Sequence, residues 1–380
     1  MKKLFLLLAF SFGILPAQAQ DSELPRMALR NLRALGMGGA AVAIPAEDNI
    51  LFNNPALLRA LKYNRVNLID LSLRLNQGVL DQINFYRDHK DQIDNIDNLS
   101  DAEKNALYAD AVAEAQKLGI VTIEGPLPVH FLTPRFGAGA FSAGNVSYEI
   151  FEGATGLPLV DVRLRGDLQA MAAYAHTLSL GPRGSAGDLH LGVTAKYLRR
   201  YLTRKTKTLS GFSSNEDLHV YRGNSFGLDL GAFYVLNRNW QFGGALYDVV
   251  TTKFKWNTAG ATPDNPVPPN KINPSLRVGA AFRPGIRLGK WFYNVAAGFD
   301  VEQPFDNNIT FFKKIYTGVE ANVTPVFSVR GGFAQGYPTF GLGMRLYVIR
   351  ADYAFYGEEL GKYASQLVSW NHAVRIQLGF

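Results

Sequence analysis

Few residues of this chain could carry out covalent chemistry. The chain has six histidines and no cysteine, which excludes disulfides, thiolate metal sites and cysteine nucleophiles. No histidine lies at HExxH or another short metal-ligand spacing. His176 and His372 could each act as a general base beside a serine, but the chain has no GxSxG motif to hold a nucleophile. We therefore expect no enzyme activity, no metal and no cofactor.

Charged residues of both signs occupy every second position from 161 to 167, within an alternating segment that extends to residue 180. This spacing places them on one face of a strand, opposite an apolar face. Inside a closed barrel, arginine can bind a ligand carboxylate or phosphate through two hydrogen bonds. Alternatively, the arginines pair with acidic side chains and fill the lumen. The candidate ligand-binding residues are Asp161, Arg163, Arg165, Asp167, Arg330, Arg345 and Arg375.

The elements that position these residues have the same period of two. About fourteen alternating segments lie near 65–76, 121–131, 135–149, 159–179, 188–206, 221–236, 240–255, 272–284, 291–303, 311–322, 325–333, 338–347, 348–357 and 367–380. Most reach the roughly 9–11 residues that a membrane-crossing strand needs. Short and long connections alternate between them, which is typical of bacterial outer-membrane barrels. The sequence therefore predicts an all-β fold, a transmembrane antiparallel β-barrel of about fourteen strands.

The two ends of the chain carry export signals. Lys2 and Lys3 precede an apolar run at 4–15 and a small-x-small motif, which predicts a signal peptide over residues 1–19. The apolar run is too short to span a bilayer as a helix. On the apolar face of the last strand we expect an assembly signal for the barrel-assembly machinery, formed by Val374, Ile376, Leu378 and Phe380. The net charge of +7 is small for a nucleic-acid-binding protein of this size, so no nucleic-acid partner is expected.

One segment breaks the strand period. Ser100 and Glu103 have the spacing of a capping box, and Leu107, Ala111 and Ala115 follow at helical spacing. We expect a helical insert over residues 79–119 within a barrel domain of 63–380. If the first strand rises from the periplasm, this insert lies on the extracellular side.

The segment before the barrel combines closely spaced glycines with an Asn-Pro-Ala motif. Three glycines in four positions let a backbone pass close to a wall, and Pro55 holds Asn54 outside the helical region. A dinucleotide-binding loop would require GxGxxG after a strand, and neither feature is present. We therefore interpret residues 20–62 as an N-terminal hatch inside the barrel, with hatch residues Gly36, Gly38, Gly39, Asn54, Pro55 and Ala56.

These motifs, together with the terminal strand, resemble the FadL-like superfamily of outer-membrane long-chain fatty-acid transporters. The resemblance is nearest to the branch of PorV-like proteins and proteins labelled conjugal transfer TraF. It implies a fourteen-stranded barrel with an N-terminal hatch, in which hydrophobic molecules are captured outside, held in the lumen and released laterally. The helical insert departs from the transporter pattern.

Two functions follow as expectations. The first is an outer-membrane protein, surrounded by outer-membrane lipids, that transports or binds a hydrophobic or amphipathic small molecule through a plugged lumen. The alternative is a structural or secretion- and conjugation-associated docking protein without transport activity, for which the insert would offer a polar surface to a secretion-system partner.

Overall fold

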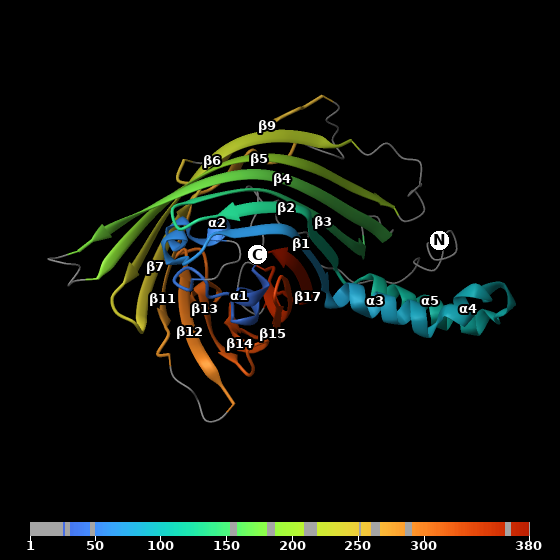
Figure 1. Ribbon diagram of the computed structural model, residues 1–380. Helices are drawn as coiled ribbons and strands as arrows, with labels where there is room; N and C mark the ends of the chain where they lie inside the picture. Colours follow the sequence, from blue (N-terminus) through green and yellow to red (C-terminus); the bar gives the residue numbers. More distant parts are fainter. Residues whose placement is uncertain are drawn as a thin grey trace.

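The computed structural model describes residue 26 and residues 31–45, 50–152, 158–180, 187–208, 219–250, 252–259, 267–285, 291–361 and 366–379. The predicted signal peptide and Phe380 lie outside the described residues. In the part described, fourteen strands form a barrel (Figure 1): β1 (Arg65–Asn76), β2 (Gly119–Leu132), β3 (Phe136–Glu152), β4 (Pro158–Ser179), β5 (Asp188–Thr208), β6 (Tyr221–Val235), β7 (Trp240–Tyr247), β11 (Ser275–Phe282), β12 (Tyr293–Glu302), β13 (Ile315–Asn322), β14 (Phe327–Ala334), β15 (Tyr337–Leu346), β16 (Ile349–Glu359) and β17 (Val368–Gly379).

The barrel is an antiparallel meander that closes on itself. Each of the fourteen strands pairs with the next along the chain, and β17 returns to pair with β1. Three two-residue strands lie outside this ring: β8 (Thr252–Lys253), β9 (Lys255–Trp256) and β10 (Lys271–Ile272). Closure leaves no unpaired strand edge, so the backbone hydrogen bonds of the wall are satisfied internally. The predicted fold class is confirmed.

The alternation of each strand places apolar side chains outside and polar ones inside. In the β1–β17 pair, Leu73 and Val374 lie opposite one another and are about half exposed, whereas Ser72 and Arg375 are buried. This is the reverse of a soluble protein, in which large apolar side chains are buried. It is the pattern of a barrel whose outer face contacts lipid. Val374 and Ile376, two residues of the predicted assembly signal, belong to this outer face.

The connections differ between the two ends of the barrel. One end has short turns at 133–135, 323–326 and 347–348, and the other has the insert and the long connections 248–274 and 303–314. We call these the short-turn end and the long-loop end. The tight hairpin at Gln335 and Gly336 is an exception at the long-loop end; both residues have positive φ, as a type I′ turn requires.

The insert between β1 and β2 contains α3 (Gln77–Asp88), α4 (Lys90–Asp94), η3 (Ile96–Asn98) and α5 (Asp101–Ala115), and extends away from the barrel (Figure 1). The side chain of Asn76 holds its base, because it accepts from the Val79 and Ile120 amides and donates to the Leu118 carbonyl. The capping box of Ser100 is present at the start of α5.

Ionic contacts also join the two long helices of the insert. Lys117 donates to Asp81 and Glu114, both at 2.8 Å. The hydrogen bond from Lys117 lowers the pKa of Asp81. Although desolvation opposes it, the bonds to the two carboxylates raise the pKa of Lys117. The pair is therefore fully ionised near neutral pH.

The N-terminal segment packs against the inner face of the barrel. It contains α1 (Leu32–Gly36), α2 (Ile50–Asn53) and η2 (Pro55–Ala60). Residues 50–58 form the largest buried apolar cluster together with inward side chains such as Phe141 and Phe233, and Met37, Val42 and Ile44 form a second cluster. The apolar core of this protein thus lies between the N-terminal segment and the wall.

Candidate functional site

The glycines of the N-terminal segment contact the barrel wall through their backbone. Gly36 lies against Gly341 of β15, where an added β-carbon would come within 2.8 Å of the Gly341 Cα. Gly38 and Gly39 have φ of +67° and +83°, in the region that favours glycine. The Gly38 amide donates to Thr339 Oγ1 at 2.9 Å. These positions require glycine both for conformation and for the close approach.

The Asn-Pro-Ala motif makes a second contact, on the opposite wall. Asn54 Oδ1 accepts from the Ala56 amide at 3.1 Å and caps η2. Asn54 Nδ2 donates to the carbonyls of Val42 and Ala232, both at 2.9 Å. Asn54 therefore joins two parts of the N-terminal segment to β6. All six predicted hatch residues lie at the contact between this segment and the wall.

Ion pairs fasten α1 to the lumen. Arg33 donates from Nε and Nη2 to the two oxygens of Glu320, at 2.8 and 2.6 Å. Glu320 also accepts from Arg330 Nε at 2.6 Å, and Arg330 Nη1 donates to Asp352 at 2.6 Å. This chain of four charged side chains alternates in sign, and we call it the Arg33 network. Arg330, one of the candidate ligand-binding residues, is therefore bonded to two carboxylates, Glu320 and Asp352.

A second anchor holds the turn after α1. Asp300 Oδ2 accepts from the Ala41 and Val42 amides at 2.8 and 3.0 Å, and from Arg277 Nε at 3.0 Å. Arg277 also donates to the Gly39 carbonyl at 2.5 Å. A buried carboxylate that receives several hydrogen bonds fixes the backbone that donates them.

The charged ladder of β4 is paired with β5. Buried Asp161 accepts from Arg163 Nε at 2.7 Å and from Arg204 Nε at 2.9 Å. Buried Asp167 receives two hydrogen bonds from Arg200, at 2.6 and 2.9 Å. Arg165 lies farther from Asp167, at 3.5 Å.

Arg375 and Arg345 lie elsewhere. Arg375 pairs with Asp70 through both guanidinium nitrogens, which links β17 to β1 where the barrel closes, and Gln377 adds a hydrogen bond of 2.7 Å to the same carboxylate. Arg345 lies exposed near the short-turn end of β15. The seven candidate residues thus do not converge on one site.

Two cavities lie in the lumen, and the N-terminal segment lines both. The cavity toward the long-loop end has a volume of about 480 Å³ and includes Ala34, Leu35 and Arg165 in its lining. The cavity at the short-turn end has a volume of about 510 Å³ and includes Arg33 and Pro45. We call them the long-loop cavity and the short-turn cavity. Because α1 supplies residues to both, it lies between them.

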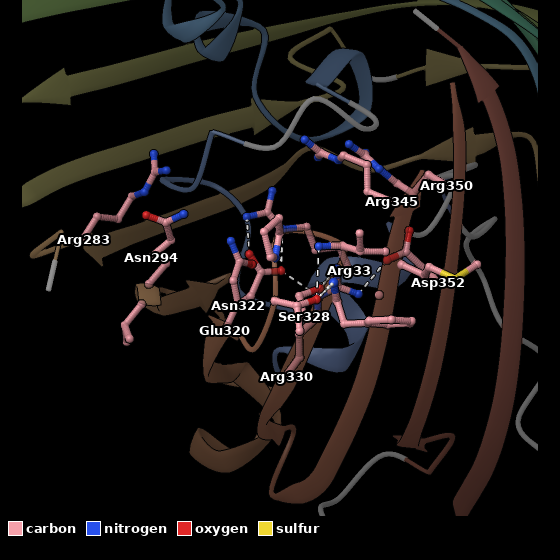
Figure 2. Close-up of a pocket in the computed structure, with 18 of the residues that line it drawn as sticks. Arg33, Arg283, Asn294, Glu320, Asn322, Ser328, Arg330, Arg345, Arg350 and Asp352 are labelled. Carbon is pink, nitrogen blue, oxygen red and sulfur yellow. Dashed lines mark hydrogen bonds and ion pairs between the residues drawn. The ribbon is translucent and has the colours of Figure 1, made fainter. Parts of the chain in front are cut away.

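The described lining of the short-turn cavity is rich in arginine. Figure 2 shows Arg283 and Asn294 at one side, Arg345 and Arg350 at another, and the Arg33 network between them. Sequence reasoning did not single out Arg33, Glu320, Arg283 or Arg350. One signal for Glu320 was available: it lies directly opposite Arg330 in the β13–β14 hairpin.

In the described part of the chain, no group of three or more histidine, aspartate or glutamate side chains is placed to hold a metal ion. No helix there is long and apolar enough to cross a membrane.

The molecule is thus a closed fourteen-stranded β-barrel whose lumen contains its own N-terminal segment. Residues 144–300 match the family model described as "F plasmid transfer operon, TraF, protein", which agrees with the resemblance found in the sequence. No curated protein matches the chain.

Several solved structures are similar to this chain. The toluene transporter TbuX of Ralstonia pickettii is 13% identical, with 91% of this chain and 97% of that one covered and a TM-score of 0.48. The toluene transporter TodX of P. putida is 11% identical, with 91% and 97% covered and a TM-score of 0.48. The CymD monoaromatic hydrocarbon channel is 11% identical, with 91% and 96% covered and the same TM-score. Shared ligands do not follow from similarity at this level.

Proposed function

We propose that this protein is an outer-membrane transporter that binds a hydrophobic or amphipathic small molecule in its lumen and passes it across the membrane. The half-exposed apolar side chains around the barrel support insertion into lipid. The short-turn end would then face the periplasm and the insert the cell exterior, as in bacterial barrels with short periplasmic turns.

The observation that carries this proposal is the placement of the N-terminal segment between two cavities. Residues 31–45 and 50–60 act as the plug, with the long-loop cavity as the first binding site and the short-turn cavity beyond it. Since α1 is fastened by ion pairs rather than by a covalent bond, it can move while the barrel stays closed. Passage then requires that the Arg33 network opens.

The lining of the long-loop cavity suits an amphipathic molecule. Leu35, Ile120 and Ala143 supply apolar contact, and the charged lining includes Arg165. Ligand sites commonly combine apolar walls with a few polar groups that orient the ligand. Arg165 belongs to this lining, and its guanidinium can bind an anionic or polar group of the ligand through paired hydrogen bonds.

The test is native mass spectrometry of the mature protein, purified from its own membrane in mild detergent and followed by lipid extraction. We expect a retained amphiphile, and we expect Arg165→Gln to reduce its occupancy severalfold. Arg163→Gln is the matched control, because Arg163 lies on the same strand face but does not line the cavity. An empty wild-type barrel, or equal occupancy in the two variants, would contradict the proposal.

A second candidate function rests on the insert. Ile83 and Tyr86 of α3 are 51% and 40% exposed, and the insert extends away from the barrel (Figure 1). These features support a docking platform for a secretion-system partner. Because β1 and β2 are paired up to Leu75 and Val121, residues 77–118 can be replaced by an Asn-Gly turn. If this replacement removes a co-purifying protein but leaves ligand retention unchanged, docking is favoured. If both the co-purifying protein and ligand retention are unaffected, transport is favoured.

A further inference from the structure

Strands β4, β5 and β6 are longer than a membrane crossing requires. They contain 22, 21 and 15 residues, whereas a tilted membrane strand needs about 9–11 residues. On the outer face near β6, exposed apolar side chains run from Leu236 through Leu230 to Phe226. At about 3.3 Å per residue and a tilt of about 40°, this run covers roughly 25 Å of height, which is the height of a lipid-facing band. The apolar band therefore ends near Phe226.

Positive side chains follow directly beyond this band. Asn224 and Arg222 are the next residues of β6 on the same face as Phe226. Asn224 lies opposite Arg199 of β5 and opposite Lys255 of β9, because β9 pairs with β6 where β7 has ended (Figure 1). Direct partners share a face of the sheet, and all four side chains are exposed. We call Arg199, Arg222, Asn224 and Lys255 the basic row.

Neighbouring strands place apolar or neutral residues opposite the cations of the basic row. Leu168 of β4 lies opposite Arg199, and Tyr201 of β5 lies opposite Arg222. The inward face of the same strands is different, since buried Arg200 is bonded twice to a carboxylate. With strands about 4.8 Å apart, the backbones of the outer two strands of the row are separated by about 10 Å. Like charges this close repel one another, and an anion bound between them removes the repulsion.

Aromatic side chains hold the basic row at the edge of the apolar band. The Arg199 guanidinium lies 5.4 Å from the centre of the Tyr201 ring, and the rings of Tyr197 and Phe226 pack with their centres 5.0 Å apart. Tyr197 donates its hydroxyl hydrogen to Asn224 Oδ1 at 2.9 Å, which leaves the Asn224 Nδ2 group as a donor. Aromatic residues gather where a barrel meets the lipid headgroups. The row is therefore at headgroup height.

We propose that the basic row binds the phosphate of an anionic membrane lipid in the leaflet on the long-loop side of the barrel. Arginine donates paired hydrogen bonds to phosphate oxygens, and cations beside a membrane attract anionic headgroups. The acyl chains of the bound lipid lie along the apolar band that ends at Phe226. The inference rests on the membrane insertion proposed above, and it does not depend on transport. In the orientation proposed above this leaflet is the outer one, whose phosphorylated lipid is lipid A.

The test measures lipid binding by native mass spectrometry. The mature protein in mild detergent is titrated with diphosphoryl lipid A, and separately with lipid A from which the phosphates have been removed. Both titrations are repeated with Arg199→Gln, Arg222→Gln and Lys255→Gln. The matched control is Arg87→Gln, because Arg87 is also exposed, with 71% of its side chain accessible, but lies on the insert. The heat-sensitive folded band in semi-native electrophoresis confirms that each variant is folded.

Each cation beside a lipid surface contributes about fivefold to binding. We expect diphosphoryl lipid A to bind about fivefold more weakly to each variant of the basic row, and with unchanged affinity to Arg87→Gln. Removing the phosphates should weaken binding to the wild type by roughly a hundredfold, because all three cations then lose their partner. Equal binding of the two lipids, or basic-row variants that behave like Arg87→Gln, would overturn the proposal. Neither result bears on ligand retention in the lumen, so the transport proposal is tested separately.

Discussion

The Glu320→Gln substitution tests whether the Arg33 network fastens the N-terminal segment. It removes one negative charge and almost no volume. Glu320 accepts three hydrogen bonds of 2.6–2.8 Å, two from Arg33 and one from Arg330. The amide that replaces it carries no charge and has one oxygen instead of two. Arg330 keeps Asp352 as a partner, so the substitution acts mainly on Arg33.

The expected magnitude follows from burial. The side chains of Arg33 and Glu320 are 17% and 9% exposed, and breaking a buried ion pair by removing one partner costs about 3–5 kcal/mol. Because Arg33 keeps some contact with water, we expect the lower end, about 3 kcal/mol. Since each 1.4 kcal/mol is tenfold, local opening of the segment should become about a hundredfold more frequent.

Hydrogen exchange measured by mass spectrometry on peptides covering residues 31–45 reports this opening. Glu124→Gln is the control. Glu124 pairs with Arg74 at 3.1 Å with side-chain exposures of 11% and 13%, so its burial is similar, but both residues belong to neighbouring barrel strands. We expect faster exchange in 31–45 for Glu320→Gln and none of that effect for Glu124→Gln.

Unchanged exchange in Glu320→Gln would refute the role of the network. Equal acceleration in both variants would show instead that any loss of lumen charge loosens the segment. A second check is additivity: Arg33→Gln and Glu320→Gln combined should cost less than the sum of the two single changes, because they remove the same interaction.

Three further outcomes are expected. Gly318→Ala, whose methyl would collide with the backbone of the N-terminal segment, should lower the free energy of unfolding measured in urea by about 1–3 kcal/mol, whereas Gly144→Ala, with open space around it, should not. Arg375→Gln leaves buried Asp70 without its positively charged partner, so the temperature at which the folded band disappears in semi-native electrophoresis should fall, and an unchanged temperature would count against the closure role. Folding lowers the pKa of Asp81, so its contribution to stability is present above the ordinary carboxylate pKa and is lost as pH falls through the folded pKa. Amide protection of the insert should therefore decrease slightly below about pH 4, by well under 1 kcal/mol because the Asp81–Lys117 pair is so exposed. Asp81→Asn should remove this pH dependence.

The sequence alone was sufficient to predict the barrel wall. A period of two over long segments is compatible only with a sheet that has one apolar and one polar face. Export signals and connections of alternating length then favour a closed membrane barrel. The expected strand at 65–76 agrees with β1, and the capping box at Ser100 begins α5. Such features are local, because hydrogen bonds and side-chain direction within a strand or a helix depend on near neighbours in the chain.

The tertiary structure decided what lies inside the wall. The glycines and the Asn-Pro-Ala motif indicated close contacts, but not that Gly36 would lie against Gly341 or that Arg33 would reach Glu320. Nor did alternation separate Arg345, which lines the short-turn cavity, from Arg375, which holds the closing strands together. Both arginines have the same inward parity. The contacts that each of them makes depend on the register of neighbouring strands and on the position of a segment some 290 residues away in sequence, and no local pattern encodes contacts over that distance.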